Sequence, residues 1–238
     1  MPCLKARWAC RNEGNRHQMR PASADDRPEL TTFIKANLPL AGVPSIPDVR
    51  LHMATPRSGL YRLAMADDSD MAPPYWAYPW AGGAVLARYL FDHPEEMAGK
   101  HVVDLGTGSG LVAIVAMKCG AAHVLAIDID AKAIAAAQLN AEANDVVIET
   151  RLGDIIEDMP PEADMILAGD VFYDEVLAER MLPFLERCRT AGMDVLIGDP
   201  GRAPLPADSL EKIAEYPAPD FGGSAQSTAA NSAVFRLK

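Results

Sequence analysis

The chain has 238 residues, of which 49% are hydrophobic, and its formal net charge is −11 at pH 7. This length and apolar content suit one α/β domain with a small N-terminal extension. The acidity argues against a nucleic-acid partner, because phosphate binding needs clustered Lys and Arg, and no uninterrupted apolar run is long enough to span a membrane.

Residues 1–22 form a basic segment, with five Lys and Arg residues against one Glu in the first twenty positions. Such a start can be an organelle transit peptide. This one has little Ser or Thr and no amphipathic stripe, so we expect a disordered start instead. The protein is therefore expected in the bacterial cytoplasm, or in the mitochondrial matrix if the source is eukaryotic.

The cysteines and histidines show no metal-ligand spacing. The four cysteines predict free thiols in a reducing compartment, because a chain of this size does not need disulfide bonds to fold. We expect a monomer without a metal site.

Residues 23–73 are predicted to form an extension in front of the main domain, which spans residues 74–238. The extension ends at the segment PYWAYPWAGG, which is rich in aromatic residues and proline. The elements expected in this region are a helix over Asp25 to Asn37, short strands near Val49 to His52 and over Leu60 to Met65, and a helix over Ala84 to Phe91.

From His101 onward, short apolar segments alternate with helical ones. Strands that alternate with helices predict a parallel sheet with helices on both faces, here a Rossmann-like seven-strand sheet. The last two segments break the alternation and predict an antiparallel C-terminal hairpin. The expected strands are His101 to Leu105, His123 to Asp128, Asp145 to Thr150, Asp164 to Gly169, Met193 to Asp199, Glu211 to Tyr216 and Ala233 to Leu237. The expected helices are Leu111 to Lys118, Ala131 to Ala143 and Val176 to Arg189.

Glycines at alternate positions follow the first strand of this region. Gly106, Gly108 and Gly110 lie in GTGSG, directly after HVVDL. Glycine there lets the backbone turn tightly and approach a ligand. A dinucleotide site reads G-x-G-x-x-G, whereas here the third glycine comes one residue early and a carboxylate, Asp104, precedes the loop. That charge repels pyrophosphate and attracts an amine, so the loop predicts S-adenosylmethionine rather than NAD, with a generic strand-to-helix turn as the alternative.

Acidic residues also end the next two predicted strands. Asp128 comes about twenty residues after the loop, where a carboxylate can accept from both ribose hydroxyls. Asp130 fits the N-cap of the following helix. Asp154 is expected to accept the adenine amino group, with a cap of a short turn as the alternative. The predicted cofactor residues also include Thr107 in the loop and Ile129 after Asp128.

From about Tyr75 to Lys238 the chain resembles the seven-strand class I methyltransferases, through VVDLGTGSG, AIDID and the terminal hairpin. The segments YWAYPWAGGAVLARYL, GDVFYDE and LIGDPGR resemble, more specifically, the electron transfer flavoprotein β-subunit lysine methyltransferase family. The ribosomal protein L11 methyltransferases are more distant in this resemblance. It implies a protein-lysine N-methyltransferase that uses S-adenosylmethionine, releases S-adenosylhomocysteine and acts on the β subunit of electron transfer flavoprotein.

The resemblance also implies roles for residues in GDVFYDE and LIGDPGR. Asp170 is expected to be catalytic as an orienting acceptor, since a carboxylate raises the pKa of a nearby amine and is a poor base for it. Tyr173, the second catalytic residue, would bond to the amine or shape its channel. Phe172 and Asp199 are expected to contact the substrate. The alternatives are a helix N-cap for Asp170 and a turn residue for Asp199.

The aromatic segment is expected to border the cofactor pocket. Trp80 would cover the adenosine, while Tyr75, Trp76 and Tyr78 would wall the lysine channel, because aromatic faces attract a sulfonium and a methylated ammonium. The pair Gly82-Gly83 would allow a close approach of the next helix. The alternative is a hydrophobic clamp that docks the N-terminal helix on the core.

Three other functions compete with lysine methylation. One is a methyltransferase of the same fold that acts on ribosomal protein L11 or another substrate. A second is a NAD-dependent oxidoreductase, which the G-x-G-x-G spacing and the lack of a catalytic Tyr-x-x-x-Lys oppose. A third is an inactive binding module, which the acids Asp104, Asp128 and Asp170 oppose.

Overall fold

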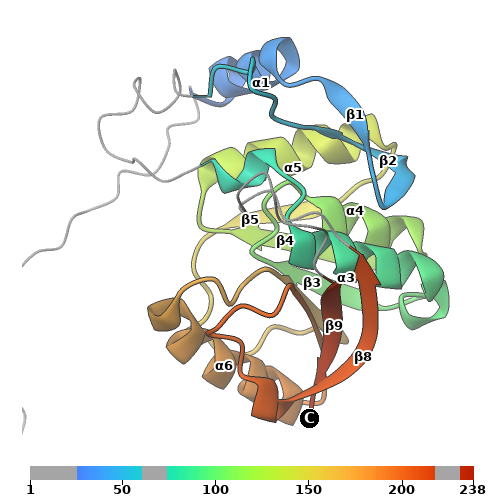
Figure 1. Ribbon diagram of the computed structural model, residues 1–238, viewed down its shortest axis with the longest axis vertical. Coiled ribbons are helices and arrows are strands. Elements are labelled where there is room, and N and C mark those ends of the chain that lie inside the picture. Colours follow the sequence, from blue (N-terminus) through green and yellow to red (C-terminus); the bar gives the residue numbers. More distant parts are fainter. Residues whose placement is uncertain (1–25, 61–73, 218–230) are drawn as a thin grey trace, which may run out of the picture.

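The computed structural model describes residues 26–60, 74–217 and 231–238 and is built on one seven-stranded sheet (Figure 1). Its strands are β3 (His101–Leu105), β4 (His123–Asp128), β5 (Glu149–Leu152), β6 (Met165–Gly169), β7 (Asp194–Asp199), β8 (Leu210–Pro217) and β9 (Asn231–Leu237). They lie in the order β5-β4-β3-β6-β7-β9-β8, and the first five are mutually parallel. β9 pairs antiparallel with both β7 and β8, so the predicted sheet with its C-terminal hairpin is confirmed.

The strand order reverses at β3. The chain runs outward from β3 through β4 to β5, and then returns to the other side of β3 with β6 and β7. In an open parallel sheet, ligands bind outside the carboxyl ends of the strands at such a reversal point. The loops after β3, β4 and β6 therefore mark the region of the site.

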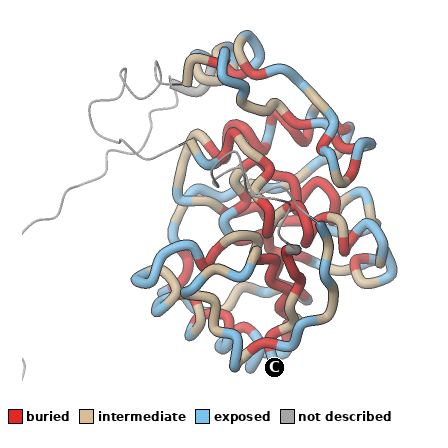
Figure 2. The backbone as a smooth tube through the Cα atoms, viewed as in Figure 1, coloured by how far each residue is buried: buried red, intermediate tan, exposed pale blue. Residues whose placement is uncertain are grey.

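Helices cover both faces of the sheet (Figure 1). On one face lie α3 (Ala81–Asp92), α4 (Leu111–Lys118) and α5 (Ala131–Ala143), and on the other lies α6 (Glu175–Thr190). Successive strand residues point to opposite faces, so Val102 packs in the core of α3 and α4 while Val103 packs in the core of α6. Figure 2 shows the buried residues running through the middle of the molecule.

A small N-terminal unit packs on the outer side of α5. It consists of α1 (Asp26–Asn37) and an antiparallel pair, β1 (Leu40–Val43) and β2 (Ile46–His52). Two asparagines, one in α5 and one at its C-cap, bind the β2 backbone: Asn140 accepts from the His52 N–H at 2.8 Å, and Asn144 accepts from the Arg50 N–H at 3.0 Å. Buried amides paired in this way fix the register of β2 against the helix.

Most predicted elements are confirmed, several with shifted bounds, and β1 was not predicted. The helix expected from Ala84 begins at Ala81, so the glycine pair lies in its first turn. The strand expected over Asp145 to Thr150 is β5, which begins only at Glu149, because Asp145 has a φ of 56° and the chain is still leaving α5 there. The predicted disordered segment 1–22 and the strand beyond Leu60 lie outside the described residues. Single-turn helices η1 (Tyr75–Ala77), η2 (Pro94–Glu96) and η3 (Ala207–Ser209) complete the elements.

Neither a metal cluster nor a membrane-spanning helix is found in the described ranges. No group of three or more His, Cys, Asp and Glu residues there could hold a metal ion. None of the helices there is long and apolar enough to cross a bilayer. Cys119 and Cys188 are free thiols, as predicted.

Candidate active site

The glycine loop after β3 is fixed by its neighbours. The N–H groups of Gly106 and Thr107 both donate to the Ile127 carbonyl of β4, each at 2.9 Å. Gly110 has a φ of 81°, and a Cβ there would lie 2.9 Å from the Ala137 Cα of α5. Only glycine allows this contact, so the loop packs on α5 while Gly106 stays exposed at the sheet edge.

Asp104 lies beneath the loop. Its side chain accepts from the Thr107 hydroxyl at 2.6 Å and from the Ala113 N–H of α4 at 3.1 Å. Burial raises the pKa of Asp104 to about 7, although the two hydrogen bonds oppose the rise. At 2% exposure the carboxylate is covered by the loop in this structure, and its direct contact with a ligand's amine stays a prediction. Asp104 and the Thr107 hydroxyl tie the loop to the start of α4.

Asp128 joins the end of β4 to the loop. Its Oδ2 accepts from the Gly108 N–H and its Oδ1 from the Asp130 N–H, both at 2.9 Å. Burial raises the pKa of Asp128, and these backbone bonds oppose the rise. A carboxylate has about four acceptor positions, so Asp128 can still accept from a ligand. Ile129 beside it is 59% exposed, and Asp130 caps α5 as predicted by accepting from the Lys132 N–H.

Asp154 lies at the exposed end of the site, after β5. Its Oδ1 accepts from the Ile156 N–H at 3.0 Å, which is the predicted alternative of a turn cap. Its Oδ2 forms an ion pair with Arg180 of α6 at 2.9 Å. A contact between Asp154 and adenine stays a prediction.

Asp170 follows β6 in a left-handed conformation, with a φ of 58°. Asp tolerates this conformation better than most residues, and strained backbone of this kind often marks a functional site. Its Oδ2 accepts from the Gly83 N–H of α3 at 2.6 Å, and its Oδ1 pairs with Arg202 Nη1 at 2.5 Å. The helix-cap alternative is wrong, because Asp174 caps α6 by accepting from the Leu177 N–H.

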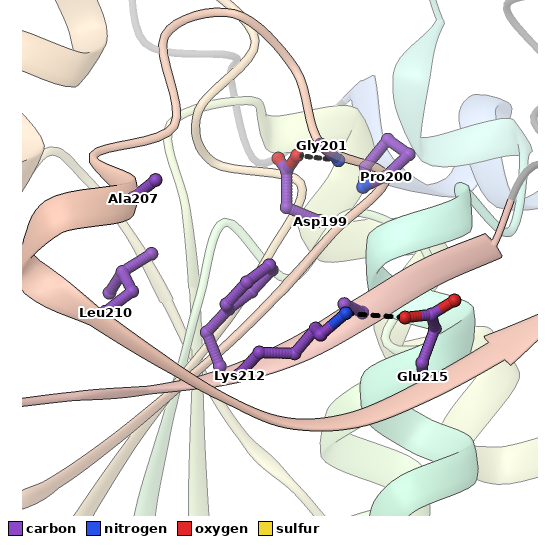
Figure 3. A pocket seen from close by; sticks show the side chains of 9 residues that line it. Asp199, Pro200, Gly201, Ala207, Leu210, Lys212 and Glu215 are labelled. Carbon is purple, nitrogen blue, oxygen red and sulfur yellow. Dashed lines mark hydrogen bonds and ion pairs between the residues drawn. The ribbon is translucent and has the colours of Figure 1, made fainter.

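Asp199 forms a turn with the residues that follow it. It is fully buried, and its Oδ1 accepts from the Gly201 N–H at 2.7 Å (Figure 3). The same oxygen accepts from the Arg202 N–H at 2.8 Å. The turn alternative is confirmed, and a contact of Asp199 with substrate stays a prediction. The turn directs Arg202 toward Asp170. Arg202 was missed, although it ends the segment LIGDPGR that the sequence singled out.

The same turn borders a pocket of about 400 Å³ on the C-terminal hairpin (Figure 3). Leu210, Ala233 and Phe235 line it, together with the ion pair between Lys212 and Glu215. Neither Asp170 nor the glycine loop contributes to it. The chemistry of the strand ends, rather than this hollow, identifies the candidate active site.

Three aromatic rings lie together near Asp128. The ring centroid of Tyr75 lies 5.7 Å from that of Trp80 and 5.8 Å from that of Tyr173. The Trp80 indole donates to the Tyr75 carbonyl at 2.7 Å, which fixes its direction. Tyr75 and Tyr173 are about half exposed, and burial followed by the charge of nearby groups raises the pKa of Tyr173, which keeps its hydroxyl protonated. We call Tyr75, Trp80 and Tyr173 the aromatic cluster; Tyr78 contacts it through Trp80.

Trp76 and Phe172 point into the protein. Trp76 is 2% exposed and packs with Ile34 and Leu38 of α1 and with Leu139 of α5. Phe172 is fully buried in the core of α6. For Trp76 the clamp alternative is confirmed, and a contact of either residue with substrate stays a prediction.

The glycine pair in the aromatic segment explains how α3 reaches the site. A Cβ on Gly82 would lie 2.2 Å from the Gly198 carbonyl oxygen, and one on Gly169 would lie 2.7 Å from the Gly83 Cα. The first turn of α3 therefore lies directly on the ends of β6 and β7. Its free N–H groups point at Asp170, where the positive end of a helix favours a carboxylate.

Comparison with known proteins gives two methyltransferase families. Residues 89–189 match the family model of ribosomal protein L11 methyltransferase. The human electron transfer flavoprotein β-subunit lysine methyltransferase is 38% identical over 196 residues, which cover 79% of this chain and 74% of the human protein. The Danio rerio protein of the same name is 36% identical over 225 residues, which cover 90% of this chain and 86% of the fish protein.

The ribosomal L11 enzymes match a shorter part of the chain. The L11 methyltransferase of an Exiguobacterium strain is 39% identical over 90 residues, only 37% of this chain and 27% of that enzyme. Among solved structures, a Pyrococcus horikoshii protein provisionally named an RNA methyltransferase superposes with a TM-score of 0.51 at 17% identity, covering 78% of this chain and 98% of that one. That likeness supports the fold alone.

Proposed function

The chain belongs to the family of electron transfer flavoprotein β-subunit lysine methyltransferases, and we propose that it transfers methyl groups from S-adenosylmethionine to lysine ε-amines of that β subunit. The observation that carries the proposal is the convergence of three features at the reversal point of the sheet. These are the glycine loop after β3, Asp128 after β4 and Asp170 after β6. The loop and the Asp170 segment are in contact, since a Cβ on Gly106 would lie 3.5 Å from Val171.

The residues around the loop fit S-adenosylmethionine. The exposed backbone at Gly106 and the half-buried backbone at Gly108 would hold its amino-acid part, and Asp128 would accept from its ribose hydroxyls. Ile129, which is 59% exposed, and Trp80 of the aromatic cluster would offer apolar surface for the adenine. When bound, the cofactor supplies an electrophilic methyl carbon: the amine lone pair forms the new N–C bond, the electron pair of the S–C bond stays on sulfur, and a proton leaves the nitrogen.

The acceptor lysine would lie between Asp170 and the aromatic cluster. A lysine with the ordinary pKa of about 10.4 costs about 4.6 kcal/mol to deprotonate at pH 7, so the site must favour the neutral amine. Asp170 accepts a hydrogen bond and holds the nitrogen in line, and Tyr173 borders the channel through which the side chain enters. Orientation of this kind can supply several kcal/mol of the barrier reduction.

The wider setting of the enzyme follows the same proposal. A charge of −11 suits a basic, lysine-bearing protein surface through electrostatic steering. We place a monomeric enzyme in the bacterial cytoplasm, or in the mitochondrial matrix of a eukaryote, which is where its substrate must be found.

The test joins cofactor binding to product formation. Calorimetry should show that the protein binds S-adenosylmethionine and that Asp128→Ala weakens this binding. Mass spectrometry of the intact electron transfer flavoprotein β subunit should then show mass added in methyl-sized steps. If the protein binds the cofactor but adds no mass to the β subunit, the assignment as a methyltransferase stands and the proposed substrate is refuted.

A further inference from the structure

We infer that Arg202 is a positioning residue for the transfer: it fixes the direction of the Asp170 carboxylate and balances its charge beside the acceptor amine. The inference rests on the proposed function, which brings a lysine ε-amine to Asp170.

Arg202 and the start of α3 hold the two oxygens of Asp170 from different elements. Arg202 Nη1 lies 2.5 Å from Oδ1, and the Gly83 N–H donates to Oδ2 at 2.6 Å. The Gly82 N–H also bonds to this carboxylate, and of its roughly four acceptor positions one is left for an amine. A carboxylate fixed at both oxygens presents that position in one direction, which an orienting acceptor requires.

The direction of Arg202 is itself fixed by Asp199. Asp199 Oδ1 accepts from the Arg202 backbone N–H at 2.8 Å, and Asp199 Oδ2 lies 3.5 Å from Arg202 Nη1. The Arg202 side chain is 21% exposed and that of Asp170 is 13% exposed, while Asp199 is fully buried. Little water can therefore take the place of these contacts.

The charge of Arg202 favours the ionised form of Asp170. Burial raises the pKa of Asp170, and Arg202 opposes that rise more than the N–H groups of Gly83 and Gly82 do. Asp199 is a second carboxylate of the cluster, and repulsion from Asp170 contributes to the raised pKa of Asp199. Such repulsion is mutual, so the negative charge of Asp199 opposes the effect of Arg202 on Asp170.

Without Arg202, Asp170 would hinder the reaction in two ways. A protonated Asp170 could no longer stabilise the positive charge that develops on the nitrogen. An ionised but unbalanced Asp170 would hold the lysine as an ammonium ion, which has no lone pair for the attack. A guanidinium stays protonated at all relevant pH, so its charge is permanent, and its planar fork suits a carboxylate.

Two variants of the cluster should shift the pH profile in opposite directions. Arg202→Gln should move the rising limb of the kcat–pH profile to higher pH, by about one unit or more, because both Asp170 and the bound lysine lose a neighbouring positive charge. Asp199→Asn keeps an oxygen for the two N–H groups and removes a negative charge, so the limb should move downward. Arg202→Lys keeps the charge but loses the fork, so the limb should stay in place while kcat falls.

NMR titration of the aspartate carboxyl carbons measures the same effect without catalysis. The Asp170 signal, assigned by its loss in Asp170→Asn, should titrate at higher pH in Arg202→Gln and at lower pH in Asp199→Asn. If Arg202→Gln does not fold, Asp199→Asn and Arg202→Lys still carry opposite predictions for pH and for kcat.

The outcomes separate this inference from the proposed function. An equal loss of rate at every pH, with an unchanged Asp170 titration, would show a merely structural Arg202 and overturn the inference. Shifted titrations in an enzyme that methylates no lysine would refute the proposed function while the charge coupling of Asp170 and Arg202 stands.

Discussion

Adding one methyl group to Gly82 should disable the enzyme, whereas adding one to Gly83 should not. In Gly82→Ala the new Cβ would lie 2.2 Å from the Gly198 carbonyl oxygen and 2.7 Å from its carbon. Relief of this clash requires the start of α3 to move by about 1 Å, because non-bonded heavy atoms pack at about 3.5 Å. In Gly83→Ala the nearest atom is Asp170 Oδ2 at 3.8 Å, an ordinary contact.

The cost of Gly82→Ala can be worked from these contacts. Overpacking costs about 1–3 kcal/mol, and loss of the 2.6 Å bond from the Gly83 N–H to Asp170 costs about 1.5–3 kcal/mol more. The higher helix propensity of alanine than of glycine offsets about 1 kcal/mol of this loss. The expected net loss of unfolding free energy is about 1.5–5 kcal/mol. Because a 1 Å displacement of the acceptor costs about a hundredfold in rate, kcat should fall by about that factor.

The assay compares both alanine variants with the wild type. Urea unfolding gives the stability, and single-turnover methyl transfer at saturating cofactor gives the rate. Gly83→Ala should stay within about 0.5 kcal/mol and about twofold of the wild type, apart from any gain in helix stability. Equal behaviour of the two variants would refute the view that α3 is packed on the ends of β6 and β7 to hold Asp170.

Three further substitutions test other parts of the site. The pKa of Asp104 is raised to about 7, so the folded state binds the proton more tightly than the unfolded state. The contribution of Asp104 to the unfolding free energy is therefore largest near pH 4 and is lost as the pH rises through 7. Asp104→Asn keeps an oxygen acceptor but cannot titrate, so it should reduce the change in unfolding free energy between pH 4 and 8 by up to roughly 4 kcal/mol. Cofactor affinity should stay nearly unchanged, and a large loss of affinity would show that Asp104 touches the cofactor. Trp76→Ala should cost about 3–5 kcal/mol in chemical unfolding, since the ring is 2% exposed, whereas the half-exposed Tyr75→Ala should cost under about 1 kcal/mol; similar losses would contradict the clamp. Asp128→Asn should weaken cofactor binding measured by calorimetry, while Asp130→Asn, which still caps α5, should not; the reverse order would exchange the roles of the two acids.

The sheet and the strand ends could be predicted because they depend on local pattern. The bounds of β3, β4, α4 and α5 are confirmed, since each is an apolar segment bounded by glycine, a charged residue or a turn. Acids at strand ends meet at one edge of a parallel sheet, so Asp128 and Asp170 were found from spacing and resemblance alone. The same pattern does not show that the first residues of DVVIET lie in the turn after α5 rather than in β5.

The direction of side chains could not be predicted in the same way. Trp76 and Phe172 lie beside exposed tyrosines in sequence, yet each points into a core formed by distant elements. Asp104 has the position of a ligand contact and is covered by the loop that follows it. The contacts that fix Asp170 come from Gly83, 87 residues earlier, and from Arg202, 32 residues later, and no local pattern reports such distances.

The most direct test of the central claim compares two acceptors in one experiment. The electron transfer flavoprotein β subunit and ribosomal protein L11 of the source organism are incubated separately with the enzyme and S-adenosylmethionine, and methylated lysines are mapped by peptide mass spectrometry. Asp170→Asn is the control, because asparagine tolerates the left-handed backbone at this position. Methyl groups on β-subunit lysines, absent with Asp170→Asn and absent from L11, are the predicted result. Methylation of L11 with an unmodified β subunit, or equal methylation by Asp170→Asn, would contradict the account.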